Sequence, residues 1–313
     1  MNTIVSPINS INELYPLYEA GAREFYFGYL DPDWVETYDC FTGNRRENYK
    51  ANFVELNDVK ELVSELKKLN VHYAVTFNDR YTSDQYDMLK KILFYLVENG
   101  VNRMIVADVG LVLCIREWGI PVDLQISTGG GTFNHNTVNF YKNLGIKRII
   151  FPRQLQIAEI NKIVEKNRDL EYEIFGMYGR DPYIDAFCRF HHGLNCMIPG
   201  VGACGCERLN NSPISDDETK ESFLPYQCLN NLYVDGCLAC GLLNLNMENV
   251  QYYKIVGRAA KTARKLEAVR FMTEVLSFDR SDSARFVQNC KEYFKEIYGS
   301  TCSPDNCYYH IED

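Results

Sequence analysis

Cysteines are the residues of this chain whose type and spacing point most directly to chemistry. Twelve occur in 313 residues, and seven of them fall between residues 179 and 246. The seven are Cys188, Cys196, Cys204, Cys206, Cys228, Cys237 and Cys240. Thiolates are soft ligands that select zinc or iron–sulfur clusters. We therefore expect a metal centre here, with Cys204 and Cys206 (GACGC) and Cys237 and Cys240 (CLAC) as close pairs of ligands.

The spacing of the cysteines leaves the metal open. It matches neither the two CxxC pairs of a zinc ribbon nor the three closely spaced cysteines of a ferredoxin. Each cysteine has the alternative of being a small buried hydrophobic residue, and Cys114, in the apolar run GLVLCI, is the clearest core candidate. Cys290, Cys302 and Cys307 are most simply structural, although the CxxxxC tail could add a ligand.

The elements that must position these residues follow a regular order. Short β-rich runs alternate with helical patterns, which is typical of βα units around a parallel sheet. Eight strands are expected, at residues 3–5, 24–28, 72–78, 103–107, 123–126, 148–151, 172–177 and 253–256. Helices are expected at residues 58–69, 84–98, 134–143, 157–166, 259–276 and 283–297, with Asn57 and Ser83 as N-cap residues.

Eight βα units predict an α/β fold of the TIM-type (β/α)8 barrel class. The competing doubly wound sheet lacks a GxGxxG motif after its first strand. We expect the barrel to cover residues 1–278, with a Cys-rich insertion at 179–246 before the last strand, and a C-terminal helix and tail at 279–313. An insertion after a barrel strand lies at the C-terminal face, where barrel enzymes carry their active sites.

Several polar residues lie at or just past the expected strand ends and are candidates for substrate binding. Arg153, Lys254 and Arg258 are the cationic ones, and guanidinium groups bind carboxylates in a bidentate manner. Gln125 begins the run QISTGGG, which suits a polar lining or an anion-binding nest. The alternative for the cations is a set of structural ion pairs beneath the loops.

Composition restricts the function classes. The hydrophobic share of 46% excludes intrinsic disorder, and 42 acidic against 33 basic residues give a net charge of −9. An acidic chain is not expected to be a general nucleic-acid binder, because phosphate affinity comes from Lys and Arg. No N-terminal signal segment and no run of about 18 apolar residues occurs, which favours a cytoplasmic protein.

The order of several motifs resembles peptidase family U32. The motifs are IIFPRQLQIAEI (149–160), EYEIFGMYG (171–179), the Cys-rich segment and YYKIVGR (252–258). EAGAREFYFG (19–28) and NRRENYKANF (44–53) are similar to the family's first repeat unit and its Asn/Arg-rich loop. Family members include proteins with a peptidase label and oxygen-independent hydroxylation proteins that act on RNA bases or on the ubiquinone ring. The latter carry a four-cysteine Fe4S4 cluster, and prephenate is implicated as their oxygen source.

The resemblance implies an iron–sulfur (4Fe-4S) site, with zinc as the alternative. Cys188 matches the first family ligand, and Cys237 or Cys240 matches the last. Cys204 and Cys206 are favoured for the middle positions over Cys196 and Cys228. In one branch of the family an early loop supplies a ligand ahead of basic residues, so Cys40 stays a candidate and Arg45 is expected to bind substrate. Met177, Tyr178 and Gly179 replace the family's usual His-Gly, and no catalytic residue is assigned.

The resulting hypothesis is an oxygen-independent hydroxylase of the U32 family that acts on a small molecule or peptide, with prephenate as co-substrate. Nucleic acid is the least expected substrate, because the chain is acidic and ends soon after the barrel. The alternatives are a U32-type peptidase or a non-catalytic, cluster-bearing subunit of a homo- or hetero-oligomer. The peptidase hypothesis finds no HExxH or GxSxG motif, only Cys188 near His191 and His192.

Overall fold

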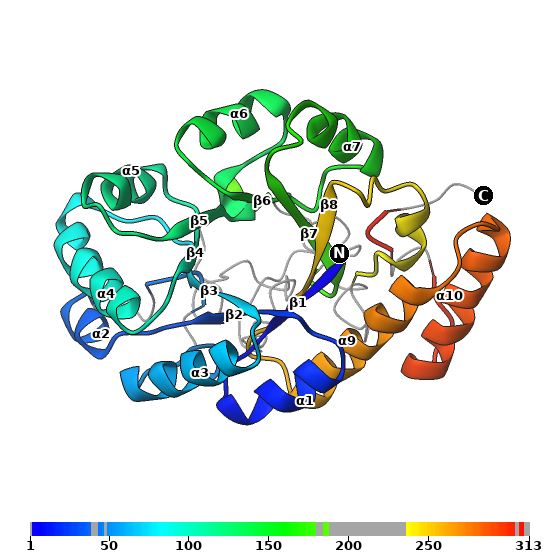
Figure 1. Cartoon of the computed structure of the whole chain (residues 1–313), viewed down its shortest axis with the longest axis horizontal. Coiled ribbons are helices and arrows are strands. Elements are labelled where there is room, and N and C mark those ends of the chain that lie inside the picture. Colours follow the sequence, from blue (N-terminus) through cyan, green and yellow to red (C-terminus); the bar gives the residue numbers. More distant parts are fainter. Residues whose placement is uncertain are drawn as a thin grey trace, which may run out of the picture.

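A closed barrel of eight parallel strands forms the centre of the protein. The computed structural model describes residues 2–38, 43–46, 49–179, 184–187, 236–303 and 307–309. Within these residues the strands follow one another around the barrel in sequence order, and β8 pairs with β1 to close it (Figure 1). They are β1 (Thr3–Pro7), β2 (Glu24–Gly28), β3 (His72–Phe77), β4 (Arg103–Val106), β5 (Asp123–Ile126), β6 (Arg148–Ile150), β7 (Glu171–Met177) and β8 (Val250–Ile255). The predicted TIM-type barrel is confirmed.

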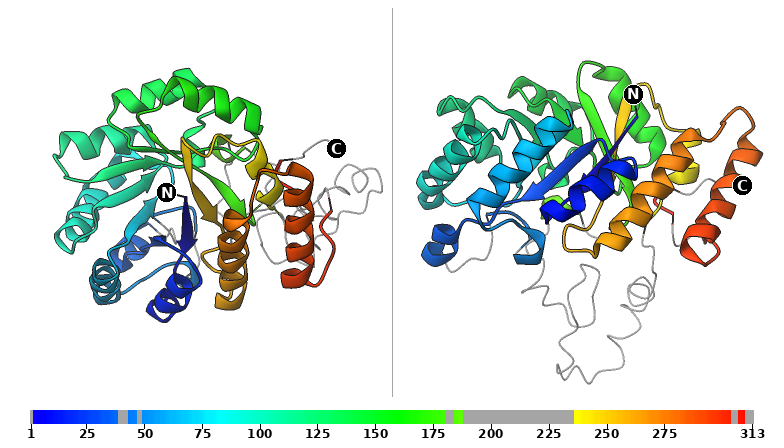
Figure 2. Two further views of the ribbon diagram at one scale, coloured as in Figure 1. Left: turned by 45° about the vertical axis from the view of Figure 1, so that its right-hand side comes forward. Right: turned by 60° about the horizontal axis from the view of Figure 1, so that its bottom comes forward.

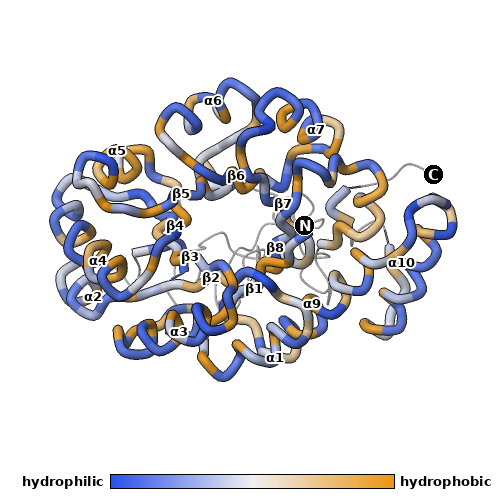
Figure 3. Tube along the Cα trace, in the orientation of Figure 1, coloured by the Kyte–Doolittle hydropathy of each residue, from blue (hydrophilic) through white to orange (hydrophobic). Residues whose placement is uncertain are grey.

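Helices surround the barrel and cover its outer face (Figure 1). They are α1 (Leu14–Glu19), α2 (Pro32–Tyr38), α3 (Leu56–Lys68), α4 (Tyr86–Glu98), α5 (Val109–Glu117), α6 (His135–Asn143), α7 (Ile157–Lys166), α9 (Thr262–Ser277) and α10 (Ser283–Tyr298). The buried residues of α3 are Val59, Leu62, Val63 and Leu66, a spacing that puts them on one face. Hydrophilic and hydrophobic residues alternate along these helices in the same manner (Figure 3). None of the helices in the described part is long and apolar enough to cross a membrane.

The interior of the barrel contains a charged layer. Arg148 is fully buried, and its Nη1 lies 2.7 Å from Glu24 Oε1 and 3.0 Å from Glu173 Oε2. Its Nη2 lies 2.7 Å from Glu171 Oε2. Since a buried charge is tolerated only with such partners, this network belongs to the stability of the barrel.

The connection between β7 and β8 is described only in part, and one described part leads into β8. The described end of this connection is the short 3-10 helix η7 (Ala239–Leu243), which packs beside α7 and α10. Helix α10 lies along the outside of α9 (Figure 2), where Phe271 of α9 packs on Phe294 and Tyr298 of α10. The C-terminal helix is therefore a second layer over the barrel's own ring.

Three local predictions were wrong. Helix α3 begins at Leu56, so Asn57 lies inside it, because the extended backbone stops at Glu55, two residues before the predicted cap. Ser83 is not a cap but the first residue of the 3-10 turn η3 (Ser83–Gln85), since Thr82 and Gln85 form a capping box around this turn and Gln85 is the N-cap of α4. Cys114 is half-exposed on α5 rather than in the core, because Leu111, Val112 and Ile115 take the buried face.

Candidate functional site

Arg258 is the buried centre of the barrel mouth. It follows β8 after Gly257, whose φ of 110° turns the chain there. The side chain is 5% exposed, and its Nη1 donates to Thr76 Oγ1 at 2.7 Å and to Asn52 Oδ1 at 3.2 Å. Its Nη2 donates to Asn44 Oδ1 at 2.7 Å. All three partners are neutral: Asn44 and Asn52 lie between α2 and α3, and Thr76 belongs to β3.

The charge of Arg258 has no carboxylate partner in the part of the chain that the structure describes. Burial, and then repulsion by Arg46, lower the pKa of Arg258 to about 9. A buried cation in neutral surroundings is costly unless an anion joins it. The arrangement therefore favours binding of an anionic group at this guanidinium.

Gly28, the last residue of β2, makes room for this arrangement. A Cβ atom at position 28 would lie 1.9 Å from Arg258 Nη1 and 1.9 Å from Asn52 Oδ1. Any side chain there would displace the guanidinium or its amide partner.

Arg45 and Arg153 meet at a single carboxylate beside the mouth. Arg45 Nη1 lies 3.0 Å from Asp185 Oδ1, and Arg153 Nη1 lies 2.6 Å from Asp185 Oδ2. Asp185 belongs to the 3-10 turn η5 (Asp185–Phe187), and Arg153 also stacks over the ring of Phe175 at 4.3 Å. Two predicted substrate-binding arginines thus meet at one buried carboxylate.

The residues that follow β5 in the run QISTGGG form a short capped turn. Ser127 Oγ caps the 3-10 turn η4 (Thr128–Gly130) by accepting from the N–H of Gly129 at 3.4 Å. The exposed Arg80, past the end of β3, donates from Nη2 to the carbonyl oxygen of Gly129. Sequence reasoning missed Arg80, although its place three residues after a strand was a usable signal.

Gln125 and Lys254 lie deeper, with the charged layer of Arg148. Lys254 Nζ is 2.6 Å from Glu173 Oε1, and burial lowers the pKa of this lysine. Gln125 Nε2 donates to Glu24 Oε1 at 3.5 Å, whereas its Oε1 has no partner among the described residues. The structure groups these two with the interior network rather than with Arg258, and their role in substrate binding stays a prediction.

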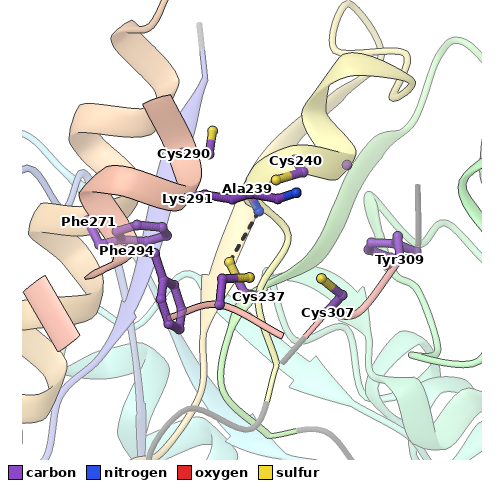
Figure 4. Close-up of a pocket in the computed structure, with 11 residues that line it drawn as sticks. Cys237, Ala239, Cys240, Phe271, Cys290, Lys291, Phe294, Cys307 and Tyr309 are labelled. Carbon is purple, nitrogen blue, oxygen red and sulfur yellow. Dashed lines mark hydrogen bonds between the residues drawn. The ribbon is translucent and has the colours of Figure 1, made fainter. Parts of the chain in front are cut away.

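The predicted metal ligands divide into two sets. Cys188, Cys204 and Cys206, and the alternatives Cys40, Cys196 and Cys228, lie outside the described residues. Cys237 and Cys240 are described, and they line a pocket with cysteines of α10 and the tail, outside the barrel (Figure 4). The role of Cys237 and Cys240 as metal ligands stays a prediction. No three His, Cys, Asp or Glu side chains of the described part already converge as a metal site.

Comparisons with known proteins identify relatives of this chain. The chain is similar to tRNA hydroxylation protein P of Haemophilus influenzae, with 26% identity over 197 residues, which cover 63% of this chain and 38% of that protein. It is also similar to the 23S rRNA 5-hydroxycytidine C2501 synthase of Escherichia coli, with 23% identity over 243 residues, covering 76% and 36% of the two chains. The chain thus matches well under half the length of these relatives.

Structure and family comparisons point the same way. The solved structure of the U32 peptidase Mk0906 has the same fold, with a TM-score of 0.50, 14% identity, and coverage of 82% of this chain and 94% of that one. The model of peptidase family U32 matches residues 9–312. The match extends over nearly the whole sequence, and the chain belongs to peptidase family U32.

Proposed function

We propose that this protein takes part in the hydroxylation of a base in RNA. The proposal is supported by relatives whose names describe hydroxylation of tRNA and synthesis of 5-hydroxycytidine in 23S rRNA. The expectation that nucleic acid is an unlikely substrate, and a small molecule or peptide the favoured one, is wrong in the light of these relatives.

The reason for that error is physical. A net charge of −9 is a sum over the whole chain, whereas RNA contacts only one face of it. Arginines gather around the barrel mouth: Arg45, Arg80, Arg153 and Arg258. Arg45 and Arg153 pair with Asp185, whereas Arg80 is exposed and donates to a backbone carbonyl. A chain that is acidic overall can therefore still present a cation to RNA.

The single observation that carries the proposal is the buried Arg258 with its neutral partners Asn44, Asn52 and Thr76. A guanidinium at this depth suits a small carboxylate better than a phosphate of a polymer, because the polymer backbone cannot enter a closed barrel. We propose that Arg258 binds the carboxylate of an anionic co-substrate such as prephenate. The exposed Arg80 is placed to contact RNA phosphates.

A 4Fe-4S cluster is part of this proposal, and when bound it would supply electron transfer or Lewis-acid chemistry. Cys237 pairs with Met177 at the end of β7, and Cys240 lines the same pocket as Cys237. We propose that the ligands are among Cys188, Cys204, Cys206, Cys237 and Cys240. This chain's own contribution is the arginine-lined mouth, which binds and orients anionic groups.

Mass spectrometry of nucleosides from total tRNA and rRNA tests the proposed function. A strain that lacks this protein should lose one hydroxylated nucleoside, and the wild-type gene should restore it. Arg258→Met should restore less than a tenth of it, because a charge-assisted hydrogen bond contributes about 1.5–3 kcal/mol. Arg285→Met, which removes an exposed arginine from α10, is the matched control and should restore it fully.

Two outcomes would contradict the proposal. An unchanged set of hydroxylated nucleosides in the deletion strain would remove RNA as the substrate. Full restoration by Arg258→Met would show that the mouth arginine is not needed.

A further inference from the structure

Phe187 is the most exposed large hydrophobic side chain in the part of the chain that the structure describes. It is 78% exposed, whereas Tyr95, the next in order, is 58% exposed. Phe187 is the last residue of the turn η5, which follows β7. Loops that follow barrel strands lie at the C-terminal face. The phenyl ring is therefore presented to solvent on the face where barrel enzymes carry their active sites.

The turn that carries Phe187 is held by buried ion pairs. Asp185, two residues before it, accepts from Arg45 at 3.0 Å and from Arg153 at 2.6 Å, and all three of these side chains are largely buried. The N–H of Phe187 also donates to the carbonyl oxygen of Ile184 at 3.0 Å. Single exposed hydrophobic residues are common on protein surfaces, but this ring stands on a backbone that two arginines fix in place.

The turn η4 lies against η5 and brings a cation to the same edge. A Cβ atom on Gly131, the C-cap of η4, would lie 3.3 Å from Ala186 Cβ. The guanidinium of the exposed Arg80 donates to the carbonyl oxygen of Gly129 in η4. Asp79 accepts from the backbone N–H of Arg80 at 2.8 Å. An exposed aromatic ring and an exposed guanidinium are thus attached to two turns that touch.

This pair of groups matches the chemistry of single-stranded RNA. Unstacked bases stack on aromatic side chains, and cationic side chains bind the phosphates between them. A ring that is 78% exposed has a free face for a base. The same exposure means that Phe187 cannot enclose the base that reacts, so it suits a neighbouring base of the strand. Contacts to such neighbouring nucleotides help enzymes that act on bases to choose their substrate.

We propose that Phe187 is the stacking platform for a base of single-stranded RNA next to the base that enters the barrel mouth, and that Arg80 binds a phosphate of the same strand. We take RNA as the polymer because this inference rests on the proposed function. Phe187 is then a binding residue that positions the strand, and the hydroxylation itself takes place on another nucleotide.

Fluorescence anisotropy of a short labelled oligocytidine RNA with the full chain tests the proposal. Phe187→Ala should weaken binding by about fivefold or more, the effect of one lost stack. The slope of log affinity against log salt should stay that of the wild type, because stacking releases no counterions. Phe140→Ala, which removes a 47% exposed ring from α6, is the matched control and should bind as the wild type does. An oligomer of abasic ribose phosphate should bind equally to the wild type and to Phe187→Ala.

A second variant keeps a stacking ring, in case alanine changes the turn. Phe187→Trp should bind oligocytidine within about twofold of the wild type, because stacking tolerates a change of aromatic ring. RNA should quench its added tryptophan fluorescence, measured above that of the chain's two native tryptophans, whereas the fluorescence of Phe140→Trp should not change.

Four results would overturn the role of Phe187. They are equal affinity of the wild type and Phe187→Ala, unchanged fluorescence of Phe187→Trp, a lower salt slope in Phe187→Ala, and no binding of oligocytidine by the wild type. Failure of the proposed function would look different. If Phe187 passes these tests but the deletion strain keeps all its hydroxylated nucleosides, the reaction is refuted and Phe187 remains an RNA-stacking residue. If a nucleoside is lost in that strain but the affinity of Phe187→Ala is unchanged, only the stacking platform is refuted.

Discussion

Two buried arginines of the barrel differ in their partners and should differ in their effect on stability. Arg148 is surrounded by the carboxylates of Glu24, Glu171 and Glu173. Arg258 is held by two amides and a hydroxyl. The first pattern is typical of a structural network, and the second is typical of a site that awaits an anion.

Replacing each arginine by methionine tests this distinction. Arg148→Met leaves three glutamates without a cation, so we expect a loss of about 3–5 kcal/mol in the free energy of unfolding. Arg258→Met removes an uncompensated charge and leaves only neutral groups, so the loss should be about 1 kcal/mol or less. Urea unfolding followed by circular dichroism measures both. Equal losses in the two variants would show that Arg258 is a structural residue.

At the level of elements, the sequence predicted most of the framework. All eight strands were placed within three residues of their observed ends, because parallel barrel strands are short apolar runs between amphipathic helices. The start of α3 was misplaced at Asn57. The side chain of Asn57 is suited to capping, but it cannot cap α3 because the backbone is already helical at Leu56. Strand and helix periods are local signals, whereas the first helical residue depends on the preceding loop.

The cap of α10 offers a test at the same scale. Asp282 accepts a hydrogen bond from the N–H of Arg285 at 3.0 Å. Asp282→Ala should cost about 1 kcal/mol in the free energy of unfolding, because an N-cap and a favourable helix-dipole interaction are lost. Glu296→Ala removes the same charge from the exposed C-terminal turn of α10 and should change stability by less than about 0.5 kcal/mol. A comparable loss in both would mean that the cap contributes nothing specific.

At the level of the whole molecule, two features could not be predicted. CLAC was expected to join the insertion, yet its described neighbours are Cys290, Cys302 and Cys307, at least 50 residues away along the chain. No local pattern reports that α10 folds back along α9 and carries the tail to η7. Arg80 was missed as well, because a sum of charges does not report where the barrel places each cation. Arg153 and Arg258 were found only because strand ends of a barrel share one face.

The uneven charge of the molecule should appear in the salt dependence of RNA binding. Rising salt screens the repulsion between RNA and the net charge of −9. The same salt weakens the contacts between mouth arginines and phosphates, because forming these contacts releases counterions. If the contacts dominate, affinity for a single-stranded RNA falls with salt, and Arg80→Gln should reduce the slope of log affinity against log salt by roughly 0.7. Lys60→Gln, which removes an exposed cation from α3, should leave the slope unchanged. Fluorescence anisotropy over a range of potassium chloride concentrations measures both. If Arg80→Gln and Lys60→Gln have equal slopes, RNA does not reach the mouth through Arg80.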